Sequence, residues 1–280
     1  MKVQDFMAEL ERDPEDGTAF ELAVEEAQAE GGIEGLELFL GEVLESLSNA
    51  EMAEAFLKKL DVQFRKERTS DAGRIYAWTA ALVAWKILDD VVRAEFFMRA
   101  VGDENLPDAS TWLEFYRVFY AKRGNWLRLE QFMAENGPKN GLVEIEARRM
   151  LARTAGEYKN PSKELSYWQD VAKSDESDPE ASENLERLYV ELQRWPQLAE
   201  LYRARLATVP EDAVEQKVAL IKQMIEIYGD RMHAEPKVLA SWQQILDVDP
   251  TNEEAIDSLM TRFEQGGRWP DYLKILEHKI

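Results

Sequence analysis

The sequence contains no cysteine, which excludes disulfides, thiolate metal sites and cysteine nucleophiles. Its two histidines, His233 and His278, stand far apart, so no pair has the spacing of metal ligands. No apolar run approaches the ~18 residues of a membrane-spanning helix, and none at the N-terminus has signal-peptide length. A chain without cysteine fits a reducing compartment. We therefore expect a cytoplasmic protein that is not inserted in a membrane.

Basic residues are scarce as well: 34 Lys and Arg stand against 55 Asp and Glu, a formal net charge of −21. This charge opposes binding to nucleic-acid phosphates and to anionic membrane surfaces. The imbalance is strongest in residues 1–50, where Lys2 and Arg12 are the only bases beside fourteen acids. We therefore expect a protein partner rather than a nucleic acid.

Sequence signatures of catalysis are also missing, since no Walker loop, G-x-S-x-G or G-x-G-x-x-G occurs. The acidic pairs Asp89-Asp90 and Glu253-Glu254 fit helix starts, where acids favour the helix dipole, and adjacent side chains point apart on a helix. The stretch "DVDPTNEEA" resembles a calcium loop but lacks its central glycine. His233 fits a solvated loop. We expect no catalytic, cofactor or metal site, and hence no enzyme.

What the sequence does contain is an internal repeat. The tripeptide Arg-Trp-Pro occurs around Trp195 and again around Trp269, and the same shift of about 74 residues places Trp168 on Trp242. A third copy of the hairpin lacks the tripeptide but keeps its spacing, since Tyr120 precedes Trp126 by six residues as Tyr189 precedes Trp195. A unit of this length holds two helical hairpins, so the repeat predicts an array of hairpins rather than a single closed core.

The repeated segments have the period of amphipathic helices. In "ASENLERLYVEL", Ala181, Leu185 and Leu188 fall on one stripe. Turn residues separate such segments, and no segment alternates like a strand. Trp195 is expected in a turn, with Pro196 opening the second helix, where a missing N–H costs nothing. For Trp195, core packing at the hairpin corner is favoured over a ligand cage. A structural role is expected for seven tryptophans: Trp78, Trp85, Trp126, Trp168, Trp195, Trp242 and Trp269.

Hairpins of this length and pattern resemble tetratricopeptide repeats. In residues 78–107, Trp78 takes the family's Trp place and Trp85 its Tyr place, while Ala94 takes the small-residue place of the second helix. The match is divergent elsewhere, because Leu198 and Arg205 occupy places where the family prefers small residues. The resemblance implies an all-α, right-handed superhelix of α-α hairpins.

Two regions are expected along the chain. Residues 1–70 should form an acidic hairpin, with a turn at "GGIEG", and an extra helix that is out of phase with the repeat. Residues 71–280 should form about five hairpins. The last hairpin stops at Ile280 inside its second helix with no polar capping helix, so we expect a piece of a longer array. The alternative is a native terminus that self-associates.

The resemblance also implies a function: a non-enzymatic scaffold or adaptor that binds a partner protein. Its first helices would line a groove, and nine positions match the groove places: Thr111, Glu114, Val118, Glu180, Glu183, Arg187, Glu254, Asp257 and Thr261. Five of the nine are acidic, which favours a basic segment of the partner, although an acidic chain places acids on every surface.

Among scaffolds of this family, bacterial multi-repeat proteins look most similar, by analogy of fold alone. Two other classes of function stay open. An alternative is a helical targeting or regulatory region of a larger enzyme or signalling protein, whose catalytic domain lies outside this chain. An RNA-processing solenoid shares the tryptophan-rich character, but the charge opposes it.

Overall fold

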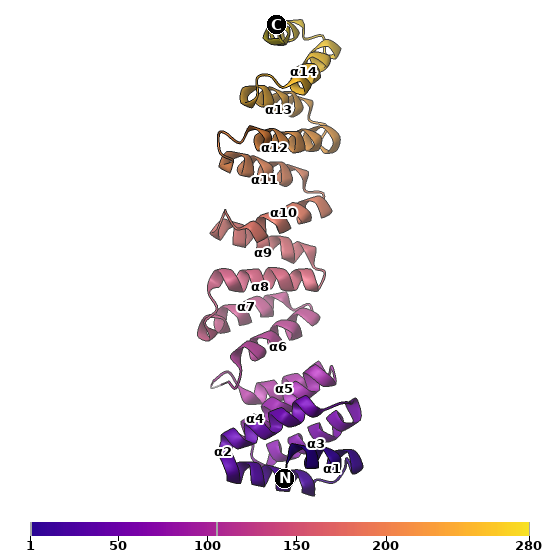
Figure 1. Cartoon of the computed structure of the whole chain (residues 1–280), viewed down its shortest axis with the longest axis vertical. Helices are drawn as coiled ribbons and strands as arrows, with labels where there is room; N and C mark the ends of the chain where they lie inside the picture. The colour runs from indigo at the N-terminus through magenta and orange to yellow at the C-terminus, as the bar shows by residue number, and fades with distance from the viewer. Residues whose placement is uncertain (1, 105, 280) are drawn as a thin grey trace. The chain divides into compact units, whose positions relative to one another are not determined.

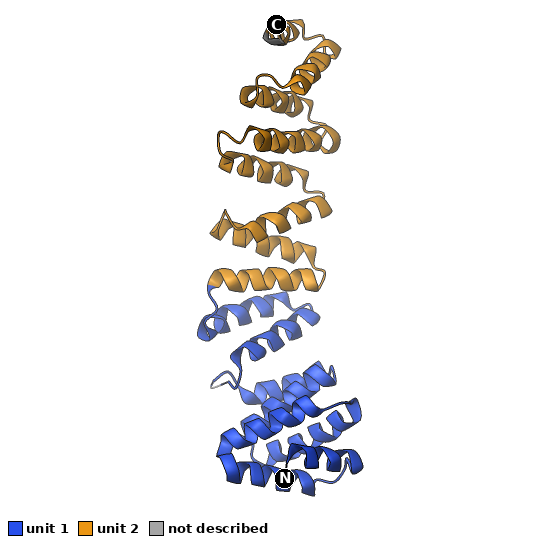
Figure 2. Cartoon of the chain, in the orientation of Figure 1, with its two compact units in different colours: residues 1–143 blue, residues 144–280 orange. Residues whose placement is uncertain are grey.

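The computed structural model describes residues 2–104 and 106–279, which form helices joined by short turns without any strand. The predicted all-α class is thus confirmed. Contacts divide the chain into two compact units, residues 1–143 and 144–280 (Figure 2). The helices (Figure 1) are α1 (Val3–Arg12), α2 (Thr18–Ser46), α3 (Ala50–Lys66), α4 (Asp71–Leu82), α5 (Val91–Val101), α6 (Ala109–Lys122) and α7 (Trp126–Asn136) in unit 1, and α8 (Glu144–Glu157), α9 (Pro161–Ser174), α10 (Pro179–Glu191), α11 (Trp195–Thr208), α12 (Val214–Glu226), α13 (Glu235–Val248), α14 (Glu253–Gln265) and α15 (Trp269–Lys279) in unit 2.

The N-terminal part of unit 1 is built around phenylalanine rings. The Phe6 ring lies 5.6 Å from that of Phe20 and 5.8 Å from that of Phe39, and Phe56 of α3 completes the cluster. Helix α2 bends sharply at Gly32, whose φ of 61° favours glycine. The bend falls within the predicted "GGIEG" turn, and it brings the two halves of α2 into contact.

The close approach within α2 depends on one glycine. A Cβ added to Gly35 would lie 2.4 Å from the carbonyl oxygen of Ala27, whereas one added to Gly41 meets nothing within 4 Å. We expect Gly35→Ala to lower the free energy of unfolding by about 1–3 kcal/mol through overpacking. Gly41→Ala in the same helix should raise it by about 0.5–1 kcal/mol, since alanine is the better helix former. Thermal melts of both variants check this, and equal stabilisation by both would contradict the close approach.

The extra helix predicted before residue 70 is α3, and it belongs to the fold of unit 1. The Lys59 side chain is 8% exposed, and its ammonium group donates to the carbonyl oxygens of Pro14 and Asp16 at 2.8 and 2.6 Å. It thereby fixes the α1–α2 loop, while burial lowers the pKa of Lys59. Helix α3 also packs directly on α4, within the compact unit of residues 1–143.

Consecutive helices pack pairwise within each unit, as Figure 1 shows for α8 to α15. The predicted array from residue 71 comprises six helix pairs where about five were expected: α4/α5 and α6/α7 in unit 1, then α8/α9, α10/α11, α12/α13 and α14/α15 in unit 2. The repeat is visible in the core, because Trp168 and Trp242 are both buried, as are Leu185 and Leu259. The hairpin architecture is therefore confirmed.

All six hairpin turns share one backbone geometry. The residue two positions before the second helix has a positive φ between 50° and 66° in each turn: Asp89, Gly124, Lys159, Gln193, His233 and Gly267. The next amide then donates back to a carbonyl of the first helix, as Arg194 does to Tyr189 at 2.7 Å and Arg268 to Phe263 at 2.8 Å. This pattern satisfies the last carbonyls of the first helix, as in a Schellman motif.

Two of the six hairpins contain an additional residue. A π-helical turn, Val83–Ile87 or Ile227–Arg231, ends the first helix of α4/α5 and of α12/α13. The wider ring of a π-helical turn accommodates one extra residue before the shared geometry resumes. In the turns before α11 and α15 the second helix starts one residue earlier than predicted, since Trp195 and Trp269 are themselves the first helical residues and proline follows.

Candidate functional site

The predicted groove residues lie on the first helices of their hairpins, and most of them are accessible. Glu114 of α6 is exposed, as are Glu183 and Arg187 of α10, whereas Glu180 is half-buried. On α14, the exposed positions are Glu254, Asp257 and Thr261. Because α10 and α14 hold equivalent places in the repeat, unit 2 carries two such sets of polar side chains. Their role in partner binding stays a prediction.

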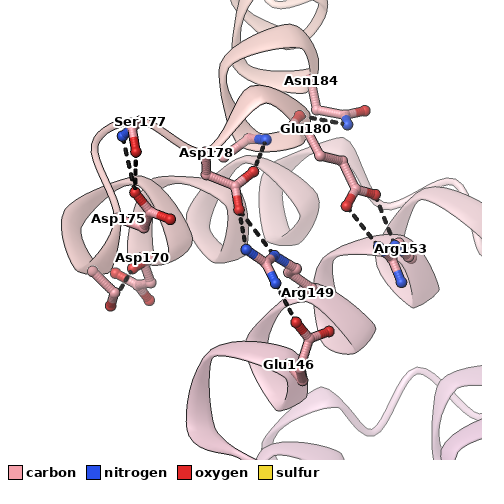
Figure 3. Close-up of polar contacts among 11 residues, drawn as sticks. Glu146, Arg149, Arg153, Asp170, Asp175, Ser177, Asp178, Glu180 and Asn184 are labelled. Carbon is pink, nitrogen blue, oxygen red and sulfur yellow. Dashed lines mark hydrogen bonds and ion pairs between the residues drawn. The ribbon is translucent and has the colours of Figure 1, made fainter.

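Several of these polar groups already have partners on a neighbouring helix. Arg153 of α8 donates to both carboxylate oxygens of Glu180, at 2.7 and 2.6 Å (Figure 3). This hydrogen bonding holds the pKa of Glu180 below its ordinary value. Glu254 likewise pairs with Lys222 of α12. These pairs join the first helix of one hairpin to that of the next, so part of the acidic charge predicted for the groove is compensated within unit 2.

A second ion pair, buried at the junction of α8 and α10, was not predicted. Asp178 is 3% exposed, caps α10 by accepting from the Ala181 amide at 2.7 Å, and accepts from Arg149 Nε at 2.9 Å (Figure 3). Arg149 also pairs with Glu146. Burial acts to raise the pKa of Asp178, but the hydrogen bonds from Ala181 and Arg149 outweigh it, so the pKa lies below its ordinary value. The Asp-Pro step before α10 is a typical helix-start signal and could have indicated the cap, but no local pattern indicates the arginine.

The seven structural tryptophans differ in burial. Trp78, Trp168 and Trp242 are buried, and Trp85, Trp126 and Trp195 are half-buried. Trp269 is 56% exposed, so the expectation of core packing fails for this ring. The corner position explains the difference, because a residue at the first turn of the second helix lies at the edge of the pair. Trp195 is covered there by the guanidinium of Arg231, 5.1 Å from its ring.

Two hollows in unit 1 are lined by side chains suited to a ligand. The larger, the α1–α2 groove, has a volume of about 1200 Å³ and lies along the start of α1 and both halves of α2. Leu38, Phe39 and Ala27 supply apolar surface, and Leu38 is 66% exposed. Glu30 and Glu42 add exposed carboxylates. The groove thus combines an apolar floor with negative charge.

The second hollow, the aromatic cleft, has a volume of about 400 Å³ and lies where α5 meets α6 and α7. Trp112, Tyr116 and Tyr120 of α6 line it together with Phe132 of α7, and Glu95 of α5 lies opposite. The sequence reasoning missed this cleft. The aromatic run "TWLEFYRVFY" signals it, but the same run also fits a helix that is buried on every side.

Within its described part, the chain was found to hold neither a cluster of metal-ligating side chains nor a membrane-spanning helix. Residues 2–104 and 106–279 contain no group of three or more His, Cys, Asp or Glu side chains arranged to hold a metal ion. None of the helices described has the length and apolar content needed to cross a membrane.

Comparisons with known proteins concern the fold. No protein-family model and no curated protein matches the chain. The crystal structure of a tetratricopeptide repeat protein from Parabacteroides merdae is similar over 86% of this chain and 97% of that one, with 14% identity and a TM-score of 0.31. The structure of Naa15/Naa10 bound to HypK-THB is similar over 99% of this chain but 44% of that one, with 18% identity and a TM-score of 0.28. The tetratricopeptide-like character therefore rests on the helix pairs and turns described above.

Proposed function

We propose that this chain is a non-enzymatic scaffold that binds a basic, amphipathic helical segment of a partner protein in the α1–α2 groove. The observation that carries the proposal is the joint presence of an apolar floor and an excess of negative charge in one hollow, whose lining holds Asp5, Glu26, Glu30 and Glu42 beside a single base, Lys2. A helix with an apolar face and a basic face matches both properties, as in helix-in-groove recognition.

The charge distribution supports this location. Residues 1–50 contain fourteen acidic and two basic residues, whereas residues 51–143 of the same unit contain fourteen of each. Glu30 and Glu42 make no ion pair among the described residues, unlike Glu180 and Glu254 in unit 2. A carboxylate that is not paired with a cation attracts an approaching basic segment more strongly, and this attraction raises the association rate.

The test is a titration of the whole chain with a labelled 16-residue Lys-Leu amphipathic peptide. We expect the double substitution Glu30→Lys and Glu42→Lys to weaken binding by about tenfold at low salt, because two attractions become repulsions. The difference should shrink at physiological salt, where the Debye length is about 8 Å. A Glu-Leu peptide with the same apolar pattern should not bind.

The matched control reverses the same amount of charge on the predicted groove residues of unit 2, as Glu183→Lys with Asp257→Lys. Binding should be retained, and the fold should be intact because exposed surface changes usually stay within about 0.5 kcal/mol. If this control loses the peptide while the Glu30 and Glu42 variant keeps it, the first-helix face of unit 2 is the site instead. If both double variants bind the Lys-Leu peptide as tightly as the parent does, neither acidic surface is the binding site.

A further inference from the structure

A further hollow of unit 1, the methionine hollow, adjoins the α1–α2 groove. It has a volume of about 370 Å³ and lies between α1, the end of α2 and the start of α3. Val3 and Gln4 line both this hollow and the α1–α2 groove. The two hollows therefore meet across the first turn of α1, and a segment that fills the groove can extend into the methionine hollow.

Part of the apolar surface of the methionine hollow is accessible to a ligand. Val3 and Met7 stand four residues apart on α1, so they share one face, and both are half-buried. Ala8 beside them is exposed. The packing face of the same helix is a different one, because Phe6 and Leu10 are each 1% exposed. Helix α1 therefore leaves part of the Met7 side chain accessible in the hollow.

The side chains around the methionine hollow indicate the kind of group that fits it. A methionine side chain is flexible and polarisable, so it adapts to the shape of a large group, and its sulfur makes favourable contacts with aromatic rings. Met52 also lines the hollow, but it is 7% exposed and supplies little accessible surface. Glu11 is the only charged residue among those described around the hollow, so the lining contains no base to repel a basic segment.

We propose that the methionine hollow receives an aromatic side chain of the same partner segment that binds in the α1–α2 groove. This inference rests on the proposed function, because the groove is what brings the segment to Val3 and Gln4. Binding removes the apolar surface of the ring from water, and the thioether of Met7 adds contacts that an aliphatic side chain does not receive. The aromatic residue thereby distinguishes between partners whose amphipathic segments are equally basic.

The experiment titrates the whole chain with three forms of the labelled Lys-Leu peptide, followed by anisotropy. Each form is extended at both ends by two glycines and one test residue, which is Phe, Leu or Ala, so that either direction of the peptide presents the test residue to the hollow. We expect the Phe form to bind about tenfold more tightly than the Ala form, and the Leu form about threefold more tightly.

Met7→Gln keeps the length of the side chain and removes the sulfur. This variant should reduce the tenfold difference between the Phe and Ala forms to about twofold, while its affinity for the Ala form stays that of the parent. If Met7→Gln does not fold, as judged by circular dichroism, Ala8→Gln takes its place. Ala8 is exposed, so the longer side chain should fill the hollow without disturbing the fold and should reduce the difference in the same way.

Met232→Gln is the matched control, since Met232 of unit 2 is also half-buried and lines neither hollow. This variant should keep the tenfold difference. Equal affinity of the parent for the Phe form and either of the other two forms, or a tenfold difference that survives the substitution in the hollow, overturns the inference. The Glu30 and Glu42 variant should weaken all three forms equally. If it does so while the three forms bind alike, the aromatic subsite fails and the proposed function stands; if none of the forms binds the parent, both fail.

Discussion

Replacing Trp168 by alanine should lower the free energy of unfolding by about 3–5 kcal/mol, the range for truncating a large buried aromatic side chain. Trp168 is 1% exposed on α9, and α9 packs against both α8 and α10, so the vacated volume cannot fill with solvent. Denaturant titrations followed by circular dichroism measure the change. The corner residue Trp195 serves as the comparison.

Trp195→Ala should cost only about 1–2 kcal/mol, because the ring is half-buried and the Arg231 guanidinium lies over it. If Trp168→Ala and Trp195→Ala lower the free energy of unfolding equally, the corner tryptophan belongs to the hydrophobic core. A larger loss for Trp168→Ala supports the division between buried helix-face tryptophans and peripheral corner tryptophans.

The second large effect is expected at the buried ion pair. Asp178→Ala removes the cap of α10 and leaves the Arg149 guanidinium without its carboxylate, and breaking a buried pair on one side typically costs about 3–5 kcal/mol. Asp178→Asn retains a side-chain oxygen for the Ala181 amide and removes only the charge. The difference between the two variants therefore separates the contribution of the cap, about 1 kcal/mol, from that of the ion pair.

The ion pair between Arg149 and Asp178 also predicts that the free energy of unfolding depends on pH. The pKa of Asp178 in the folded chain lies below its ordinary value, so its contribution to stability is fully present above about pH 4, the value for an unfolded aspartate. The contribution is lost as the pH falls below 4 and the carboxylate is protonated in both states. The stability gap between the parent and Asp178→Asn should accordingly narrow between pH 7 and pH 3. A gap that stays constant over this range would show that the charge of Asp178 is not what stabilises the junction.

Helix positions were predictable because amphipathic periodicity is local. The stripe through Ala181, Leu185 and Leu188 specifies α10 without reference to any other helix. The hairpin turns were predicted as breaks, but their common geometry was not. Glycine marks the left-handed position in two turns, whereas Gln193 and His233 adopt the same conformation with no sequence signal for it. The repeat length places them there, because the first helix has to end where the second can pack back on it.

Surface properties were less predictable than the helices, because they depend on which helices meet. The sequence indicated acidic side chains on the first helices of unit 2, but not that Arg153 and Lys222 would neutralise Glu180 and Glu254 from the preceding hairpin. The aromatic cleft likewise depends on how far α5 lies from α6 and α7, a separation that no local pattern encodes. Residues 1–50 keep an excess of acids over bases, although Glu15 and Glu21 pair with Lys58 and Lys66 of α3.

The pairwise stacking of helices in unit 2 has a consequence for how that unit opens. Each helix from α8 to α15 packs mainly on the next one along the chain, so the contacts span short sequence distances. In such a one-dimensional arrangement, neighbouring hairpins are coupled only through their shared interfaces, and local unfolding can stop at a weak interface. Loss of the pair between Arg149 and Asp178 weakens the interface between α8/α9 and α10/α11. Amide hydrogen exchange in Asp178→Ala should then proceed at two distinct rates on the two sides of residue 178, where the parent unit exchanges more uniformly.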